Sequence, residues 1–162
     1  MSGTVRVRTA LAADREAIVG LIRALNIHEA AITGDRLVTH SAADAYYLAL
    51  LDRIARQEGR LLAAEAEAEA GVVGMLGLIV QEDQVFVRAD LRRHGYVSDL
   101  VVDGAWRGQG VGRLLIGEAE RLTREKGLKR LVIGVMAGNA AAERLYGELG
   151  FSVYAKAMMK PL

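Results

Sequence analysis

Apolar and polar positions change their period several times along the chain, and these changes predict its elements. Val5 and Val7 alternate with arginines, which predicts a short strand with one buried face. Apolar residues then recur at helical spacing over residues 14–30, and a second amphipathic helix is expected over residues 41–55. The joint between these helices, residues 33–40, is polar and irregular.

The middle of the chain allows two interpretations. Residues 61–69 end in strict alternation of alanine and glutamate, where helix propensity alone would favour a helix. A turn at residues 70–71 and the apolar run over residues 72–80 make an antiparallel hairpin more coherent. Residues 81–93 are polar and basic and predict no clear element. The hairpin would place three carboxylates on its solvent face, those of Glu65, Glu67 and Glu69.

The last third of the chain alternates strands with helices. Residues 108–126 and 139–149 have helical periodicity, and each stretch is followed by a glycine, which is common after a helix. A strand, two helices, a run of strands and then alternating strands and helices are typical of a mixed α/β or α+β fold. No linker or repeat divides the chain, so a single domain over residues 1–162 is expected. The strands of this part are expected over residues 96–102, 131–136 and 151–159.

Composition and charge narrow the function classes. The chain of 162 residues can bury a core of its own, and its net charge of +1 gives no reason to expect a nucleic-acid or membrane partner. It has no cysteine, which excludes disulfides, a thiolate nucleophile and cysteine-ligated metals. Its three histidines lack the spacing of a metal site, so no metal is expected. No apolar run could span a bilayer and no signal-peptide pattern is present, which favours a cytoplasmic protein.

Residues 101–113 form the most informative segment, because an apolar strand, a glycine-rich turn with Arg107 and an amphipathic helix follow one another directly. Glycines let the backbone approach a ligand closely, and a helix start offers unpaired N–H groups and a positive dipole end. This combination suits a diphosphate. An ordinary glycine-rich connection is the simpler alternative. A Rossmann dinucleotide site is weaker, because the spacing is Gly-x-Gly-x-Gly rather than Gly-x-Gly-x-x-Gly.

A second motif further along the chain supports the phosphate-loop hypothesis. The loop Arg107-Gly108-Gln109-Gly110-Val111-Gly112 resembles the acetyl-CoA pyrophosphate loop of the GCN5-related N-acetyltransferases, of form Arg/Gln-x-x-Gly-x-Gly/Ala. The segment Asn139-Ala140-Ala141-Ala142-Glu143-Arg144-Leu145-Tyr146-Gly147-Glu148-Leu149-Gly150-Phe151 is similar to that family's Asn-x-x-Ala-x-x-Leu-Tyr-x-x-Leu-Gly-Phe motif. The resemblance implies a mixed, mostly antiparallel sheet flanked by helices, with splayed parallel strands at the cofactor site.

The resemblance also implies an N-acetyltransferase that uses acetyl-CoA, in which an amine attacks the thioester directly and CoA is released. The pantetheine arm would enter between the strand that precedes the loop and the strand at residues 131–136, and would pair with backbone like an added strand. Loop N–H groups and neighbouring arginines would hold the pyrophosphate. The residues expected to contact the cofactor are Leu100, Val101, Val102, Arg107, Gly108, Gln109, Gly110, Val111, Gly112, Arg113, Asn139 and Tyr146.

Two residues are candidates for catalysis. Tyr146 has the position of the family's tyrosine that hydrogen-bonds the CoA sulfur, and a phenol with a pKa of about 10 can protonate a thiolate whose conjugate acid has a pKa of about 8.5. A core tyrosine on a helix stripe is the simpler alternative. Several family members have a glutamate base two residues before the position of Leu100, where this chain has Ser98. The neighbouring Asp99 is the candidate base, directly or through water, although a structural buried carboxylate fits the sequence equally.

The acceptor is expected to be a primary amine of a small molecule or a peptide. In this family's fold the first two helices, their joint and the segment before the central strand select the acceptor. These regions supply the substrate-binding candidates Glu29, Tyr46, His94 and Tyr96, with Asn26 and His28 as further ones.

Other hypotheses remain open. The chain could be a non-catalytic acyl-CoA sensor or scaffold. It could also transfer a longer acyl group such as succinyl, if Arg92 or Arg93 reaches the acyl end. Homodimers are common in the family, and Met158, Met159 and Leu162 on the last expected strand offer apolar material for a dimer contact.

Overall fold

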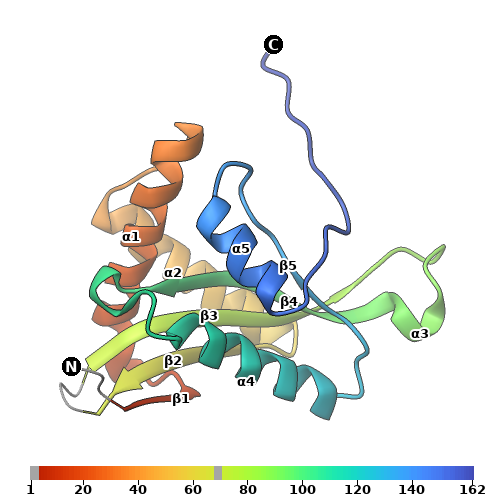
Figure 1. The fold of residues 1–162 in the computed structure, drawn as a ribbon, viewed down its shortest axis with the longest axis horizontal. Helices are drawn as coiled ribbons and strands as arrows, with labels where there is room; N and C mark the ends of the chain where they lie inside the picture. The colour runs from red at the N-terminus through yellow and green to blue at the C-terminus, as the bar shows by residue number, and fades with distance from the viewer. Residues whose placement is uncertain (1–3, 68–70) are drawn as a thin grey trace.

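The computed structural model describes residues 4–67 and 71–162 (Figure 1). Within these residues, five strands form one sheet in the order β1-β2-β3-β4-β5, and every neighbouring pair except β4 and β5 is antiparallel. The mixed, mostly antiparallel sheet expected from the sequence is therefore confirmed. The strands are β1 (Val5–Thr9), β2 (Arg60–Ala66), β3 (Gly71–Glu82), β4 (Arg93–Val102) and β5 (Leu131–Ile133). The helices are α1 (Arg15–Thr33), α2 (His40–Arg56), α3 (Ala89–Arg92), α4 (Val111–Glu125) and α5 (Ala140–Glu148), with 3-10 turns η1 (Ala12–Asp14) and η2 (Gly104–Trp106).

Helices cover both faces of the sheet (Figure 1). α1 and α2 pack on one face, and α4 packs on the other, where α5 adds Tyr146 and Leu149. Burial of a large aliphatic side chain contributes about 1.5–3 kcal/mol, so these two layers hold the helices on the sheet. The first layer includes Ile18, Ile22, Leu50, Met75 and Val101. The second includes Leu76, Val97, Leu115, Ile116 and Ala119.

A β-bulge at Ser98 sets the direction of the side chains in the second half of β4. Val97 pairs with Leu78 of β3 and Asp99 pairs with the adjacent Gly77, so Ser98 is an extra residue. One extra residue reverses the alternation of side chains between the two faces. Asp99 consequently turns toward α2. The residues of β4 that contact the α4 side are Val97, Leu100 and Val102.

Gly77 provides the space for this bulge. A Cβ atom at this position would lie 2.5 Å from the Oγ of Ser98 and 3.3 Å from Oδ2 of Asp99. The Ser98 hydroxyl donates a hydrogen bond to the Gly77 carbonyl at 3.3 Å, across the irregular register. The bulge therefore depends on a glycine in the neighbouring strand.

The predicted order of helices and strands agrees with the structure up to α5, although several of them begin or end at other residues than expected. The hairpin is present as β2 and β3, although Glu69 and Ala70 lie outside the described residues. The expected helix over residues 108–126 begins only at Val111, because Gly108 and Gly110 have positive φ angles of 73° and 83°. The expected strand over residues 131–136 ends at 133.

On the predicted solvent face of the hairpin, Glu65 is half-buried, with 22% of its side chain exposed. Its carboxylate accepts hydrogen bonds from Arg6 and Arg8, and Arg8 also donates to Asp14 at 2.7 Å. These two arginines hold the pKa of Glu65 at about 2. Glu67 is exposed as expected.

The predicted last strand over residues 151–159 is wrong. After Gly150, with a φ of 91°, the chain is extended but pairs with no strand of the described residues, and it leaves the body of the protein (Figure 1). A strand requires a neighbour for its N–H and carbonyl groups, and within residues 4–67 and 71–162 this segment pairs with none. Val153 and Met158 are 77% and 98% exposed.

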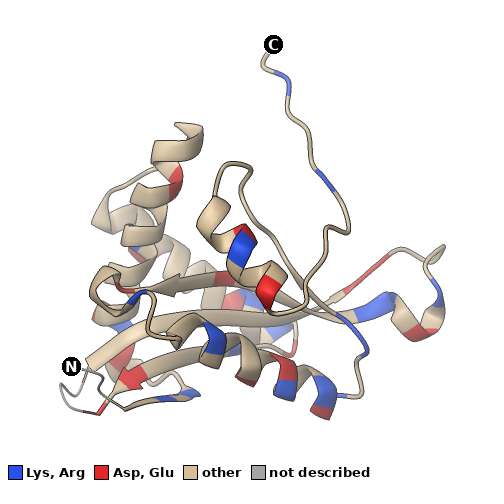
Figure 2. Ribbon diagram, viewed as in Figure 1, with Lys and Arg blue, Asp and Glu red and all other residues tan. Residues whose placement is uncertain are grey.

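Basic and acidic residues are intermixed along α4 and α5 in the view of Figure 2. On α4, Arg121 pairs with Glu118 and Glu125, and Arg124 pairs with Glu120. Exposed pairs at this spacing contribute about 0.3–0.5 kcal/mol each, so the core and not these pairs determines stability. Among the described residues, no helix combines the length and the apolar character needed to cross a membrane.

Candidate active site

β4 and β5 run parallel but stay paired over a short distance. The pairing extends from Gly95 with Leu131 to Val97 with Ile133. β4 then continues to Val102 beside β3, whereas the chain after β5 enters the loop that precedes α5. The parallel strands are therefore open along the carboxyl half of β4, as the resemblance to the family implied.

Two cavities adjoin this opening. The loop cavity, of about 530 Å³, lies between the carboxyl end of β4, the glycine-rich loop and the starts of α4 and α5. The sheet cavity, of about 510 Å³, lies between α1, α2, the bulged part of β4 and the loop after β5. The two cavities meet at the residues that line both, which are Leu25, Leu100, Asn139, Ala142 and Tyr146.

The glycine-rich loop lines the loop cavity with Arg107, Gly108 and Gly110. Gly108 and Gly110 adopt left-handed backbone conformations, which residues with a Cβ atom disfavour. Gly110 is the N-cap of α4, so the first N–H groups of that helix have no intrahelical acceptor. Arg107 donates from Nε to the carbonyl of Val102 at 3.1 Å, which fixes the loop to the end of β4.

Gln109 and Arg113, which were predicted to contact the cofactor, also bond to other parts of the protein. Gln109 donates from Nε2 to the carbonyl of Ala105 at 2.9 Å and lines neither cavity. Arg113 lines the loop cavity and pairs with Glu148 of α5 at 3.0 Å. This ion pair joins the two motifs that the sequence analysis identified separately. All the other predicted cofactor residues line the loop cavity.

α5 brings Tyr146 to the junction of the two cavities. Asn139 caps this helix, because its Oδ1 accepts a hydrogen bond from the N–H of Ala142 at 3.2 Å. Burial, with a smaller contribution from the charge of Glu29, raises the pKa of Tyr146 to about 12. The phenol therefore stays protonated near neutral pH and can donate a hydrogen bond or a proton to a ligand.

Asp99 is the buried carboxylate of the sheet cavity. The hydroxyl of Tyr46 donates to it and lies 2.9 Å from each carboxylate oxygen. Burial raises the pKa of Asp99, although the neighbouring hydroxyls of Ser98 and Tyr46 oppose the increase. Burial and the charge of Asp99 also raise the pKa of Tyr46, so the phenol keeps its proton. Asp99 can therefore exchange a proton with a ligand at a higher pH than an ordinary aspartate.

A comparison with models of known protein families identifies the family of this chain. The sequence model described as the acetyltransferase (GNAT) family matches residues 27–151. The chain belongs to this family. The matched span includes both motifs and most residues that line the two cavities.

Individual GNAT relatives match at modest identity. YobR of Bacillus subtilis, described as an uncharacterized N-acetyltransferase, is 37% identical over 59 residues, which are 36% of this chain and 24% of YobR. Glucosamine 6-phosphate N-acetyltransferase of Trypanosoma brucei brucei is 30% identical over 87 residues, which are 54% of this chain and 55% of that enzyme. The chain thus matches about half or less of the length of these relatives. A solved GCN5-related N-acetyltransferase from Ralstonia eutropha JMP134 shares the fold, with a TM-score of 0.73, 24% identity and coverage of 98% of this chain and 99% of its own.

Three of the four predicted substrate residues lie together. Glu29, Tyr46 and Tyr96 line the sheet cavity, with Tyr46 bonded to the candidate base. Arg36 also lines this cavity and donates from Nε to Glu29 at 2.9 Å. The sequence analysis missed Arg36, because it lies in the irregular joint between α1 and α2, where no periodic pattern singles it out. It also left out Trp106, which lines the loop cavity from within the quoted loop segment.

His94 lies outside both cavities. It is 4% exposed near the amino end of β4, with Nδ1 3.2 Å from the carbonyl of Arg92 and 3.5 Å from Asp83. A strand rises about 3.3 Å per residue, so His94 lies well before the bulge that opens the site. Arg92 and Arg93 line neither cavity, and Arg93 pairs with Glu58 at 2.6 Å. Neither arginine therefore has the position that the succinyl hypothesis requires.

The buried carboxylate predicts how stability changes with pH. Because the pKa of Asp99 is raised in the folded chain, the folded state holds its proton above the ordinary value of about 3.9, where the unfolded state loses it. Asp99 therefore costs stability as the pH rises through that interval. Asp99→Asn removes this cost, so its melting temperature relative to the wild type should increase from about pH 4 upward and level off once the wild-type carboxyl is ionised.

The measurement is thermal unfolding of both proteins, followed by circular dichroism, across that pH range. A tenfold change in proton affinity corresponds to about 1.4 kcal/mol, which is large enough to resolve. A difference between the two proteins that stays constant or decreases with pH would show that the pKa of Asp99 is not raised.

Proposed function

We propose that the chain is an N-acetyltransferase that moves the acetyl group of acetyl-CoA to the primary amine of a small molecule or a peptide. One observation carries the proposal: the loop cavity and the sheet cavity meet at Leu100 and Tyr146, inside the opening between β4 and β5. A thioester at this junction has a phenol on one side and the carboxylate of Asp99 on the acceptor side.

The loop cavity offers groups that can bind each part of acetyl-CoA. The unpaired N–H groups at the start of α4 and the guanidinium of Arg113 bind the pyrophosphate. Among the described strands, none pairs with residues 100–102 of β4 on the β5 side, so their backbone is free to bond the amides of the pantetheine arm. Trp106 and Leu145 give the cavity apolar walls.

Two proton transfers are needed, and Asp99 of the sheet cavity and Tyr146 of the junction each carry out one. When bound, acetyl-CoA supplies an acetyl group activated as a thioester. An ammonium acceptor first releases one proton to solvent, and Asp99, directly or through water, takes the proton that the neutral amine loses as its nitrogen bonds to the acetyl carbon. Tyr146 gives its phenolic proton to the sulfur as the carbon–sulfur bond breaks, so the products are an acetamide and the free thiol of CoA. Asp99 then releases its proton to solvent, and Tyr146 regains one.

The sheet cavity favours a small polar amine as the acceptor. Its volume of about 510 Å³ is within the range of about 300–1,000 Å³ of small-molecule sites. Glu29 and Asp99 attract a cationic amine, and Arg36 offers a partner for an anionic group on the same molecule. The relative from Trypanosoma brucei brucei is named for glucosamine 6-phosphate, which carries both an amine and an anionic group. This supports an acceptor of that chemical kind here.

Gly112→Val tests where the pyrophosphate binds. Gly112 lies in the first turn of α4 and lines the loop cavity, so valine methyl groups would occupy space that the phosphates need. We expect the KM for acetyl-CoA to rise at least about tenfold, which corresponds to about 1.4 kcal/mol of binding. Gly117→Val is the matched control, because it lies in the same helix with open space around its Cβ position. Equal KM values for the two variants would contradict the placement of the pyrophosphate.

Tyr146→Phe separates an enzyme from a binding module. Loss of a general acid lowers kcat by about 100- to 10,000-fold while the cofactor still binds. Tyr47→Phe is the control, because Tyr47 lies in the core beside α1 and lines neither cavity. The measurement is thiol release from acetyl-CoA with a panel of amines. CoA binding without thiol release for any amine, in the wild type as well as in the variant, would favour the acyl-CoA sensor.

A further inference from the structure

Tyr46 of α2 and Asp99 of β4 are joined by a hydrogen bond in the sheet cavity. The phenolic oxygen lies 2.9 Å from each carboxylate oxygen, so both oxygens share the single proton of the hydroxyl. Gly77 of β3 lets α2 and Asp99 come together. A Cβ atom on this glycine would lie 3.3 Å from Oδ2 of Asp99 and 3.3 Å from Cδ1 of Leu50, which follows Tyr46 by one turn of α2.

The hydroxyl of Tyr46 is already used as a donor. A phenol has one proton to donate, and in this structure the carboxylate of Asp99 accepts it. The sequence analysis expected Tyr46 to bind the substrate. A donor that is bonded to the base before an acceptor arrives fits a different role, in which the phenol acts on the carboxylate and not on the acceptor.

Asp99 depends on this bond because no cation binds it directly. Among the described residues, the carboxylate has a phenol and no lysine or arginine as a hydrogen-bonding partner. The charge of Arg53 acts on it only through space. Arg36 lines the same cavity, but its guanidinium is paired with Glu29. Burial favours the protonated carboxyl, and the hydrogen bond from Tyr46 favours the charged one.

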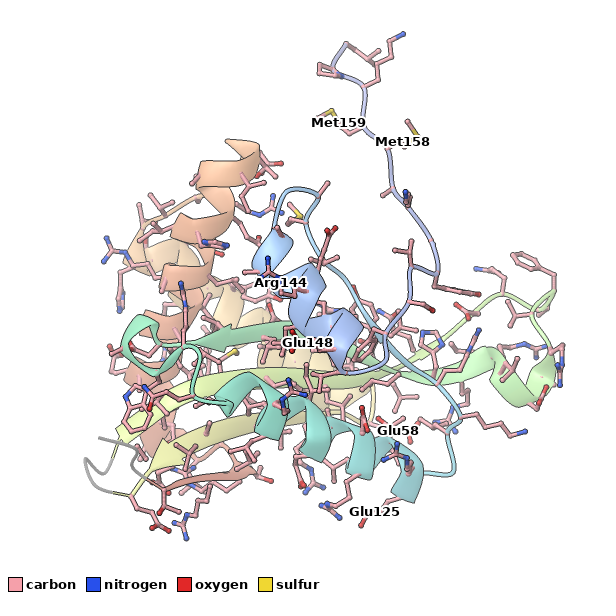
Figure 3. The ribbon with its side chains drawn as sticks, in the orientation of Figure 1. Glu58, Glu125, Arg144, Glu148, Met158 and Met159 are labelled. Carbon is pink, nitrogen blue, oxygen red and sulfur yellow. The ribbon has the colours of Figure 1, made fainter. Side chains whose placement is uncertain are left out.

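The other titratable groups around Asp99 do not replace this bond. The negative charge of Glu29 opposes the ionisation of Asp99. Tyr96 and Tyr146 line the cavity, but within the described part of the chain neither is hydrogen-bonded to the carboxylate. The charged side chains that Figure 3 labels on α5 also stay outside the sheet cavity, and they are Arg144 and Glu148.

We propose that Tyr46 is a positioning residue, which orients Asp99 and keeps it ionised as the base of the transfer, and that Tyr46 does not bind the acceptor. This role rests on the acetyl transfer proposed above. An ionised carboxylate has about four lone-pair sites, so the shared proton of one phenol leaves room for the proton of the amine or for a water. The hydrogen bond thus directs Asp99 without blocking it.

A titration of Asp99 tests the proposal without any turnover. Tyr46→Phe removes one oxygen atom and keeps the ring. Since the lost hydrogen bond stabilises the charged carboxylate, the pKa of Asp99 should rise by about one unit relative to the wild type. The measurement is NMR of the side-chain carboxyl carbons in ¹³C-labelled protein, with the Asp99 signal assigned by its absence from Asp99→Asn.

Tyr47→Phe is the matched control for this titration. Tyr47 is the next residue of α2, lies in the core and lines neither cavity, so its loss of a hydroxyl should leave the titration of Asp99 as in the wild type. An Asp99 pKa that is unchanged or lowered in Tyr46→Phe would overturn the proposal. So would an equal rise in both variants.

A double-mutant cycle shows whether Tyr46 acts through Asp99. The assay is thiol release from saturating acetyl-CoA with the fastest amine of a panel that includes glucosamine 6-phosphate. Tyr46→Phe should lower kcat about tenfold at the acid end of the pH profile and less at the alkaline end, where the carboxylate is ionised again. In the Asp99→Asn background the same substitution should change kcat less than about twofold.

The cycle also distinguishes the two roles of Tyr46. Losses that multiply in the double variant, or a raised KM for the amine with an unchanged kcat, would show that Tyr46 contacts the acceptor and would overturn the proposal. A wild type that releases no thiol with any amine would contradict the proposed function. The carboxyl titration would then still decide whether Tyr46 controls Asp99.

Discussion

The hydrogen bonding of β4 changes on both of its sides at one place, and the site depends on this change. On one side the pairing with β5 ends at Val97, and on the other the bulge at Ser98 shifts the register with β3. The backbone beyond this point keeps β3 as a neighbour and is open toward β5. Because open N–H and carbonyl groups must bond to something, they favour a bound chain with amides of its own over a closed sheet. Gly77 permits the arrangement, because any side chain there would collide with Ser98.

The same bulge determines the electrostatics of the site. It turns Asp99 toward α2, where Tyr46 donates to both of its oxygens, and it leaves Leu100 on the opposite face, at the junction of the two cavities. Burial raises the pKa of two different groups of the site. It raises the pKa of Asp99, which makes the carboxylate a better base, and it raises the pKa of Tyr146, which keeps the phenol protonated. The proposed acyl transfer from a thioester to an amine uses a base and an acid of this kind, and here Asp99 lines the sheet cavity while Tyr146 lines both cavities.

The parts of the fold with strong local signals were predictable from the sequence. The amphipathic pattern of α1, α2 and α4 gave these helices within a few residues, and the glycines around the loop indicated its turns because Gly108 and Gly110 need positive φ angles. The bulge left no such signal, since its register depends on a glycine in the neighbouring strand. For this reason the sequence left the role of Asp99 open. Arg36 and the burial of His94 likewise depend on contacts between distant segments. The predicted last strand is absent because residues 151–159 pair with none of the described strands, and such pairing depends on how distant segments meet.

The most direct test of this account is an NMR titration of the ¹⁵N-labelled chain with CoA, because every loop residue concerned has an N–H group of its own. The account predicts that the largest amide shifts occur at Gly108, at residues 110–113 and at residues 100–102, with little change at Gly117 on the far part of α4. Shifts centred elsewhere, for example on the small cavity beside Leu131 and Phe151, would contradict it. So would the absence of any shift at millimolar CoA.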